Sequence, residues 1–122
     1  MADVKLTTPV GPYSHFQIDE NRVITSGQVA ETPEGESWAD RSIAEQTRLA
    51  MENLGCVLEA AGSSFEKALK INIYMTDLSK FDEMNAEYRK FFPNGSYPAR
   101  CCVEVRNLYG GFGIEIDAIA KR

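Results

Sequence analysis

Residues 67–76, KALKINIYMT, decide how the chain is organised. Apolar side chains occupy every second position, while lysine, asparagine and tyrosine stand between them, and this period of two predicts a β-strand with one buried face. The alternating apolar positions are Leu69, Ile71, Ile73 and Met75. The period of the hydrophobic pattern changes on both sides of this segment. We therefore expect a strand that connects two helices along the chain.

The helix before this strand has a clear start and a clear end. Ser42 and Glu45 form a capping box, in which a serine side chain and a glutamate three residues later satisfy the free N–H groups of the first turn. From there apolar residues recur at helical spacing as far as Ala61. The helix is expected to end at Gly62.

The helix after the strand is shorter. It is expected to begin near Asp77 or Ser79 and to stop before Pro93, because proline is rarely accommodated inside a helix. Its apolar stripe consists of Phe81, Met84, Tyr88 and Phe91. This stripe is expected to pack on the buried face of the sheet.

Four further strands complete the prediction. Residues 16–30, FQIDENRVITSGQVA, indicate a hairpin around a turn at Glu20–Asn21, and two more strands are expected at 99–105 and 114–120. The resulting order, β-β-α-β-α-β-β, predicts an α+β fold, with a mixed sheet and both helices on one of its faces. We expect one domain that spans residues 1–122.

The composition excludes several classes of protein. The formal net charge of the 122 residues is -5, so the field of the whole molecule repels phosphate backbones, and nucleic acid is not an expected partner. No apolar run reaches the roughly 20 residues that a bilayer span needs, and the first residues lack the apolar core of a signal peptide. A cytoplasmic protein that does not bind membranes is expected.

No cofactor or metal site is apparent in the sequence. The chain has three cysteines and one histidine, His15, without a Cys-x-x-Cys pair or any other metal-ligand spacing. The glycine-rich run YGGFG at 109–113 lacks the lysine and hydroxyl residue of a phosphate-binding loop. We therefore expect neither a bound metal nor a nucleotide cofactor.

Two strands carry unexpected charges. Alternation puts Arg100, Cys102 and Glu104 on one face of the strand that follows the second helix. The opposite face carries Cys101, Val103 and Val105. This more apolar face is expected to meet the helices. In the last strand Glu115 and Asp117 share a face, and if the two strands pair, as neighbours along the chain commonly do, Arg100 and Glu115 face the same space.

The residues alone leave two interpretations of this charged face open. In the first, the face is solvated and its charges form ion pairs, each worth at most about 1 kcal/mol. In the second, another subunit covers the face, the planar guanidinium of Arg100 binds a carboxylate in a bidentate manner, and a glutamate handles water.

Six blocks of sequence over nearly the whole chain occur in the order typical of the RidA family, also called the YjgF or L-PSP family, and resemble it. The blocks are GPYSH at 11–15, VITSGQV at 23–29, EQTRLAMENLGCVLEAAGSS at 45–64, YMTDLSKFDEMNAEYRKFFP at 74–93, YPARCCVEV at 97–105 and IEIDAIAKR at 114–122. The resemblance implies a chorismate-mutase-like fold. It also implies a homotrimer whose sheets form an inner barrel, with a small pocket at each subunit interface.

The activity implied by the resemblance is the hydrolysis of reactive 2-imino acids. Such enzymes convert 2-aminoacrylate and 2-iminobutanoate, which pyridoxal-phosphate enzymes release, to 2-keto acids and ammonia without a cofactor. The expected ligand is thus a small 2-imino or 2-keto acid. Other family members are described as acting on aminomuconate-type acids, as ribonucleases or as chaperone-like proteins, so a role in ligand binding or as a ribonuclease or chaperone stays open as the alternative.

The resemblance also assigns roles to individual residues. It implies that Arg100 holds the substrate carboxylate and that Glu115 positions or activates the attacking water. The implied substrate-binding residues are Tyr13, Ser26, Gly27, Asn85 and Cys102. Many relatives carry Pro and Lys between the last two strands, where this chain has LYGGFG at 108–113. This loop leaves the preferred side chain of the substrate open.

Overall fold

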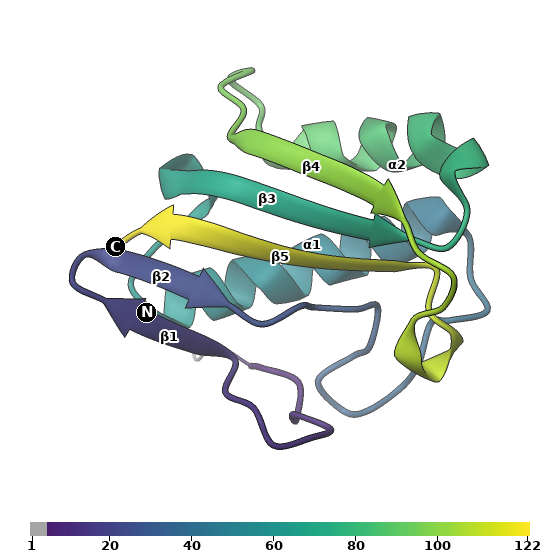
Figure 1. Ribbon diagram of the computed structural model, residues 1–122, viewed down its shortest axis with the longest axis horizontal. Helices are drawn as coiled ribbons and strands as arrows, with labels where there is room; N and C mark the ends of the chain where they lie inside the picture. Colours follow the sequence, from purple (N-terminus) through teal and green to yellow (C-terminus); the bar gives the residue numbers. More distant parts are fainter. Residues whose placement is uncertain (1–4) are drawn as a thin grey trace.

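The computed structural model describes residues 5–122 as a five-stranded sheet with both helices on one face (Figure 1). The strands are β1 (Phe16–Asp19), β2 (Arg22–Thr25), β3 (Ala68–Met75), β4 (Ala99–Glu104) and β5 (Ile114–Lys121), and the helices are α1 (Ile43–Ala60) and α2 (Phe81–Tyr88). The predicted order of elements and the α+β class are confirmed. Within the described range, no helix combines the length and the apolar character that crossing a bilayer requires.

The strands lie in the order β1-β2-β5-β3-β4. Only β3 and β4 are parallel, which makes the sheet mixed. The expectation that β4 and β5 pair is wrong, because β3 lies between them. The reason is that α2 connects β3 to β4 as a crossover, and a crossover places the second strand parallel to the first. As a result, β4 takes the outer edge of the sheet, and β5 inserts between β2 and β3.

The predicted alternation along β3 is confirmed and forms the centre of the core. Ile71, Ile73 and Met75 have no exposed surface and pack with residues of both helices, among them Leu54 of α1 and Met84 of α2. In β5, Ile114, Ile116 and Ala118 face the same core, so the acidic residues between them point to the other side. That other side is not covered by a helix (Figure 1).

The register of β4 corrects the expected orientation of its two faces. Arg100 lies beside Ile71, and Cys102 lies beside Ile73. Residues side by side in a sheet share a face, so both lie on the helix side. Val103 instead lies on the open face and is 40% exposed. The position of β4 at the edge of the sheet explains why a charged residue is accommodated on the helix side. Helix α2 borders this face of β4, so the Arg100 side chain can reach the edge of the sheet beside the helix.

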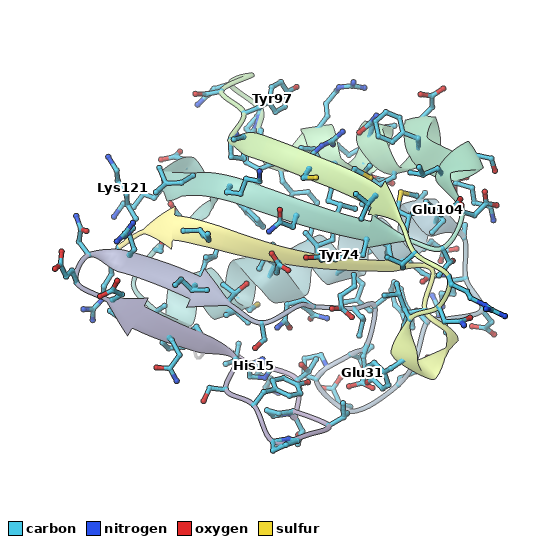
Figure 2. All side chains as sticks on the ribbon, in the orientation of Figure 1. His15, Glu31, Tyr74, Tyr97, Glu104 and Lys121 are labelled. Carbon is cyan, nitrogen blue, oxygen red and sulfur yellow. The ribbon has the colours of Figure 1, made fainter. Side chains whose placement is uncertain are left out.

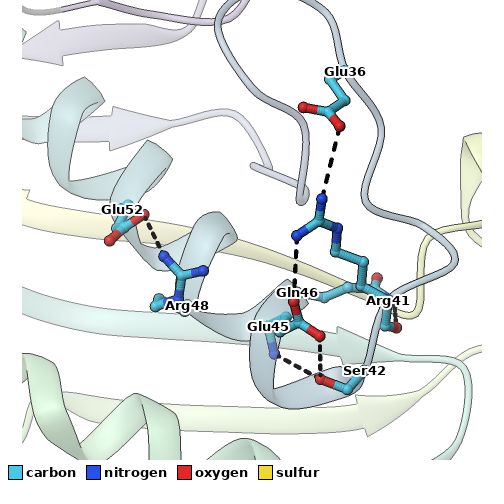
Figure 3. Close-up of polar contacts among 7 residues, drawn as sticks. All are labelled: Glu36, Arg41, Ser42, Glu45, Gln46, Arg48 and Glu52. Carbon is cyan, nitrogen blue, oxygen red and sulfur yellow. Dashed lines mark hydrogen bonds and ion pairs between the residues drawn. The ribbon is translucent and has the colours of Figure 1, made fainter.

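The start of α1 follows the predicted capping box. The N–H of Glu45 donates to Ser42 Oγ at 3.1 Å. Arg41 then connects this first turn to the preceding acidic loop, since its guanidinium lies 3.3 Å from the Glu45 carboxylate and 3.7 Å from that of Glu36 (Figure 3). These contacts tie the loop that follows β2 to the helix.

A second contact between α1 and this loop fixes a part of the chain that matters for the site. The side-chain amide of Asn53, a buried residue of α1, donates to the backbone oxygens of Val29 and Glu31 at 2.9 and 2.7 Å. A buried amide that satisfies two carbonyls in this way is costly to replace. It therefore holds residues 29–31 at a defined distance from the core.

The second helix begins later than predicted. Asp77 accepts a hydrogen bond from the Ser79 N–H, but this cap starts a 3₁₀ turn over Leu78–Lys80, and α2 itself begins at Phe81. Phe81 is also 36% exposed, whereas the rest of the predicted stripe is largely covered. In the hairpin, Glu20 adopts a φ of 57°, as expected for the tight turn between β1 and β2.

Candidate functional site

The structure distributes the expected site residues between two pockets that share no lining residue. The first, which we call the acidic pocket, has a volume of about 370 Å³ and is lined by Tyr13, Ser26, Gly27, Glu115 and Asp117 among others. The second, the arginine pocket, has a volume of about 240 Å³. It is lined by Asn85, Tyr88, Arg89, Tyr97, Pro98 and Arg100. Cys102 lines neither pocket.

The two pockets lie at different parts of the sheet. Glu115 pairs with Tyr74 and so lies on the open face, while Arg100 lies on the helix side of the edge strand β4. In Figure 2, Tyr97 marks the β4 edge, and His15 and Glu31 mark the opposite region of the molecule beyond β2. The expectation that Arg100 and Glu115 of one chain face the same space is therefore wrong.

Gly27 makes room for the carboxylate of Glu115. The segment that follows β2 runs against β5, because the backbone groups of Gln28 and Ile116 exchange hydrogen bonds of 2.8 and 3.0 Å. A Cβ atom at Gly27 would lie 2.8 Å from Glu115 Cγ and 2.7 Å from Glu115 Cδ. A side chain at position 27 would displace the Glu115 carboxylate, so the glycine allows the backbone segment to lie directly beside the acid in this position.

The environment of Glu115 favours its protonated form. Burial, and secondarily the charge of Asp117, raises the pKa of the Glu115 carboxyl above its usual range. Asp117 itself accepts a hydrogen bond from the Asn72 side-chain amide at 2.8 Å, which holds it in place two residues along the strand. A carboxylate with a raised pKa is a stronger base than an ordinary one, and this suits it to take a proton from water.

The wall of the acidic pocket on the N-terminal side is built from hydrogen bonds to backbone. The hydroxyl of Ser26 donates to Ser14 O at 2.6 Å. His15 Nε2 lies 2.5 Å from Thr7 O, and its Nδ1 lies 3.3 Å from the side-chain amide nitrogen of Gln28. A neutral imidazole with its proton on Nε2 satisfies both contacts. His15 thus anchors the segment that carries Tyr13 to the pocket.

The LYGGFG segment reaches the same pocket. Tyr109 lines it and is half exposed, while Phe112 is buried beside Ala30. Gly110 adopts a φ of 69°, and a Cβ at this position would lie 2.8 Å from the Phe112 ring, so the loop needs glycine here. The loop therefore contributes an aromatic ring to the rim of the acidic pocket.

In the arginine pocket, helix α2 holds Arg100 with three side chains. The guanidinium donates to Asn85 Oδ1 at 2.7 Å, and its central carbon lies 4.8 Å from the ring centre of Tyr88 and 5.5 Å from that of Phe81. The spacing of four and three residues puts all three side chains on one stripe of the helix. Aromatic faces attract guanidinium groups, so this stripe restricts the orientation of Arg100.

Phe81 and Tyr88 were missed as site residues by the sequence interpretation, which assigned them to the apolar stripe alone. The available signal was their spacing from Asn85. Within residues 5–122, none of the ion pairs involves Arg100, so the interpretation of this residue as one half of a surface salt bridge is not supported.

The hydroxyl of Tyr88 makes no contact that would explain its presence. It is buried, and no hydrogen-bond partner lies near it in the described part of the chain. Burial raises the pKa of Tyr88 to about 12, although the charge of Arg100 opposes this effect. The phenol thus stays neutral, and the contribution of Tyr88 to the site comes from its ring.

Cys102 behaves as a small apolar residue. Burial raises the pKa of its thiol, and the side chain packs against the core cluster that contains Ile73. A protonated thiol is a poor nucleophile. In the described part of the chain, no three His, Cys, Asp or Glu side chains are grouped so that they could hold a metal ion.

Comparisons with known proteins place these features in context. The family model described as Endoribonuclease L-PSP matches residues 5–122. A RutC family protein of Pasteurella multocida is 41% identical over 117 residues, which cover 93% of this chain and 89% of the relative. The 2-iminobutanoate/2-iminopropanoate deaminase of Escherichia coli is 40% identical over 116 residues, with the same coverage. The crystal structure of the Escherichia coli YjgF gene product superposes with a TM-score of 0.91 at 36% identity and covers 99% of this chain and 96% of the other.

The ring of Tyr88 can be tested separately from its hydroxyl. Tyr88→Phe keeps the aromatic face under Arg100 and removes a buried hydroxyl without a partner, so thermal stability is expected to be retained or raised. Binding of a small 2-keto acid, the ligand class that the family resemblance implies, is expected to be retained as well. Tyr88→Leu removes the face and is expected to weaken the binding of 2-oxobutanoate about 2- to 30-fold, measured by calorimetry. Met84→Leu, a buried change on the same helix, is the control for altered packing. Equal losses in the two Tyr88 variants would contradict the assignment.

The raised pKa of Glu115 predicts how stability depends on pH. Its folded-state pKa exceeds that of the unfolded chain, so the folded state binds more protons between the two values, and stability falls as pH rises through this window. Glu115→Gln is always neutral and is therefore expected to unfold at a higher temperature than the wild type at pH 7. The difference should disappear below the pKa of an unfolded glutamate, about 4.3. Glu34→Gln, an exposed change, serves as control. A Glu115→Gln protein less stable than wild type at pH 7 would contradict the conclusion that folding raises the pKa of Glu115.

Proposed function

The chain belongs to the L-PSP endoribonuclease family, also called the RidA or YjgF family, and from this premise we propose that it is an imine deaminase. Its substrates are reactive 2-imino acids such as 2-aminoacrylate and 2-iminobutanoate, and its products are the 2-keto acid and ammonia. One observation carries the proposal: Arg100, a group suited to bind a carboxylate, and Glu115, a carboxylate suited to act as a base, each line a pocket. The deaminase of Escherichia coli, 40% identical, supports the choice of reaction.

The complete site is proposed to form between chains. Arg100 and Glu115 lie on opposite faces of one sheet, so a small acid reaches both only if the arginine pocket of one chain faces the acidic pocket of another. The open face of the sheet supports such assembly, because it exposes apolar side chains such as Ile24 and Val103, which are 47% and 40% accessible. A homotrimer with one site at each interface satisfies this requirement.

At the proposed site, Arg100 binds the carboxylate of the substrate. Asn85 accepts one N–H of the guanidinium, and the remaining N–H groups stay available for a bidentate contact. Because α2 already restricts the guanidinium, less conformational entropy is lost when the acid binds. This contact fixes the position of C2, the atom that reacts.

Glu115 then activates water. Its carboxylate takes a proton from a water molecule while the water oxygen bonds to C2 of the protonated imine, which gives a tetrahedral carbinolamine. The proton passes to the amino group, the C2–N bond breaks, and ammonia leaves as the hydroxyl at C2 loses its proton and becomes the carbonyl. For 2-aminoacrylate, protonation at C3 first converts the enamine to the imine. All atoms come from the substrate and one water.

The charges of the two pockets match those of the substrate. A protonated 2-imino acid carries a negative carboxylate and a positive imine nitrogen. The arginine pocket attracts the first, and the carboxylates of Glu115 and Asp117 attract the second. Because such imines are short-lived in water, we place the activity in the cytoplasm, where pyridoxal-phosphate enzymes release them.

The description of the matching family also names an endoribonuclease. The net charge of -5 opposes RNA binding, and a ribonuclease of this kind would show an affinity for RNA that falls steeply with salt. A ligand-binding or chaperone-like protein would not depend on Glu115. These alternatives therefore differ from the deaminase in measurable ways.

The proposal is tested by keto-acid release from freshly generated 2-aminoacrylate and 2-iminobutanoate. The wild type is expected to exceed the spontaneous rate. Arg100→Ala should lose about 2 to 5 kcal/mol of transition-state stabilisation in kcat/KM, as expected when a desolvated charge pair is broken. Glu115→Gln should keep keto-acid binding but lose about 10²- to 10⁴-fold in kcat. Arg106→Ala removes an exposed arginine outside both pockets and serves as control. A folded wild type that gives only the spontaneous rate would refute the deaminase.

A further inference from the structure

The arginine pocket contains a second guanidinium that the proposed reaction does not use. Arg89 lines this pocket together with Arg100, and none of the six lining residues is acidic. The chain as a whole has 18 acidic and 13 basic residues, so a pocket with two arginines and no acid departs from its average composition. Within residues 5–122, neither arginine forms an ion pair. The pocket is therefore a concentrated positive region on an acidic protein.

The geometry of α2 places Arg89 near the amide that holds Arg100. Arg89 directly follows the last residue of α2 and stands four positions after Asn85, a spacing at which side chains are neighbours on a helix surface. Asn85 in turn binds Arg100 at 2.7 Å. Arg89 is exposed, so its side chain is free to approach a ligand in the pocket. The next residue, Lys90, is instead paired with Glu87 at 2.8 Å and does not line the pocket.

The two arginines differ in how firmly they are held. Arg100 is restricted by an amide and two aromatic rings, while the side chain of Arg89 has no hydrogen-bond or ion-pair partner in the described part of the chain. Two cations that share a pocket repel each other, and a ligand with two anionic groups removes this repulsion. Tyr97, 52% exposed at the same pocket, adds a hydroxyl donor. The pocket therefore offers hydrogen-bond donors and positive charge suited to a ligand with two carboxylates.

We propose that Arg89 is a specificity-determining residue that binds a second carboxylate, so that the site prefers 2-imino dicarboxylic acids of four or five carbons to alkyl imino acids of the same length. This inference rests on the proposed function, in which Arg100 holds the first carboxylate beside C2. The cavity of about 240 Å³ suits a small acid of this kind, because it lies below the roughly 300 Å³ at which pockets for drug-sized ligands begin. The products are the 2-oxo dicarboxylic acid and ammonia.

The test compares 2-oxoglutarate with 2-oxopentanoate, which has the same five-carbon chain but lacks the distal carboxylate. Calorimetry on the wild-type assembly is expected to give a dissociation constant about tenfold or more lower for 2-oxoglutarate, as a charge-assisted hydrogen bond implies. Arg89→Gln should abolish this preference and leave 2-oxopentanoate binding unchanged. Lys90→Gln removes the neighbouring cation outside the pocket and should retain the preference.

The same pair is then compared as substrates, with the imines of glutamate and norvaline generated by an amino acid oxidase. Equal wild-type affinity for the two keto acids would overturn the inference. So would an Arg89→Gln protein that loses affinity for both equally, because both arginines would then bind a single carboxylate. A preference for 2-oxoglutarate without acceleration of either imine would instead refute the deaminase and leave the assignment of Arg89 to the second carboxylate standing.

Discussion

The burial of one face of β3 determines where the charges of this protein lie. Ile71, Ile73 and Met75 must face the helices, because they form the centre of the core. A shift of the register by one residue would expose all three, so the register is strongly specified. Through the pairing of strands, this constraint puts Arg100 on the helix side and Glu115 on the open face. The separation of the acid from the arginine is thus a consequence of packing.

This separation gives assembly a chemical role. An arginine and a glutamate placed side by side in one chain would form an ion pair, and the substrate would then have to break it. Because Arg100 and Glu115 lie on opposite faces of the sheet, they do not form an ion pair with each other within one chain. In the proposed site a second copy brings them together around the ligand, which carries one negative and one positive group of its own. Helix α2 contributes by restricting Arg100 before the ligand arrives.

The sequence predicted the elements well because their signals are local. The alternation along β3, the capping box of Ser42 and the turn at Glu20 depend on near neighbours, and all three are present in the structure. The expected pairing of the last two strands is wrong because strand order depends on the crossover through α2, which no local pattern encodes. The faces of Arg100 and Val103 were assigned wrongly for a separate reason: the more apolar face of the strand was expected to meet the helices, whereas the register with β3 turns Arg100 toward them.

The site shows the same division. The family resemblance pointed to Glu115 and Gly27, and their contact in the structure supplies a physical reason for the glycine. The resemblance also pointed to Asn85, which lies against Arg100. Periodicity assigned Tyr88 to the core alone. An apolar helix stripe has the same sequence pattern whether it only packs on the core or also contacts a functional side chain such as Arg100. Arg89 gave no signal, since an exposed arginine at the end of a helix is ordinary in sequence.

The most direct test of the account asks whether one site uses residues from two chains. Arg100→Ala and Glu115→Gln proteins, each expected to have lost most of its activity, are mixed in equal amounts, unfolded together and refolded, and deaminase activity is measured. With random assortment, about a quarter of the interfaces pair an intact Arg100 with an intact Glu115 from the neighbouring chain, so about that fraction of wild-type activity should return. If the mixed oligomers form but stay inactive, the site does not lie between chains and the central claim is wrong.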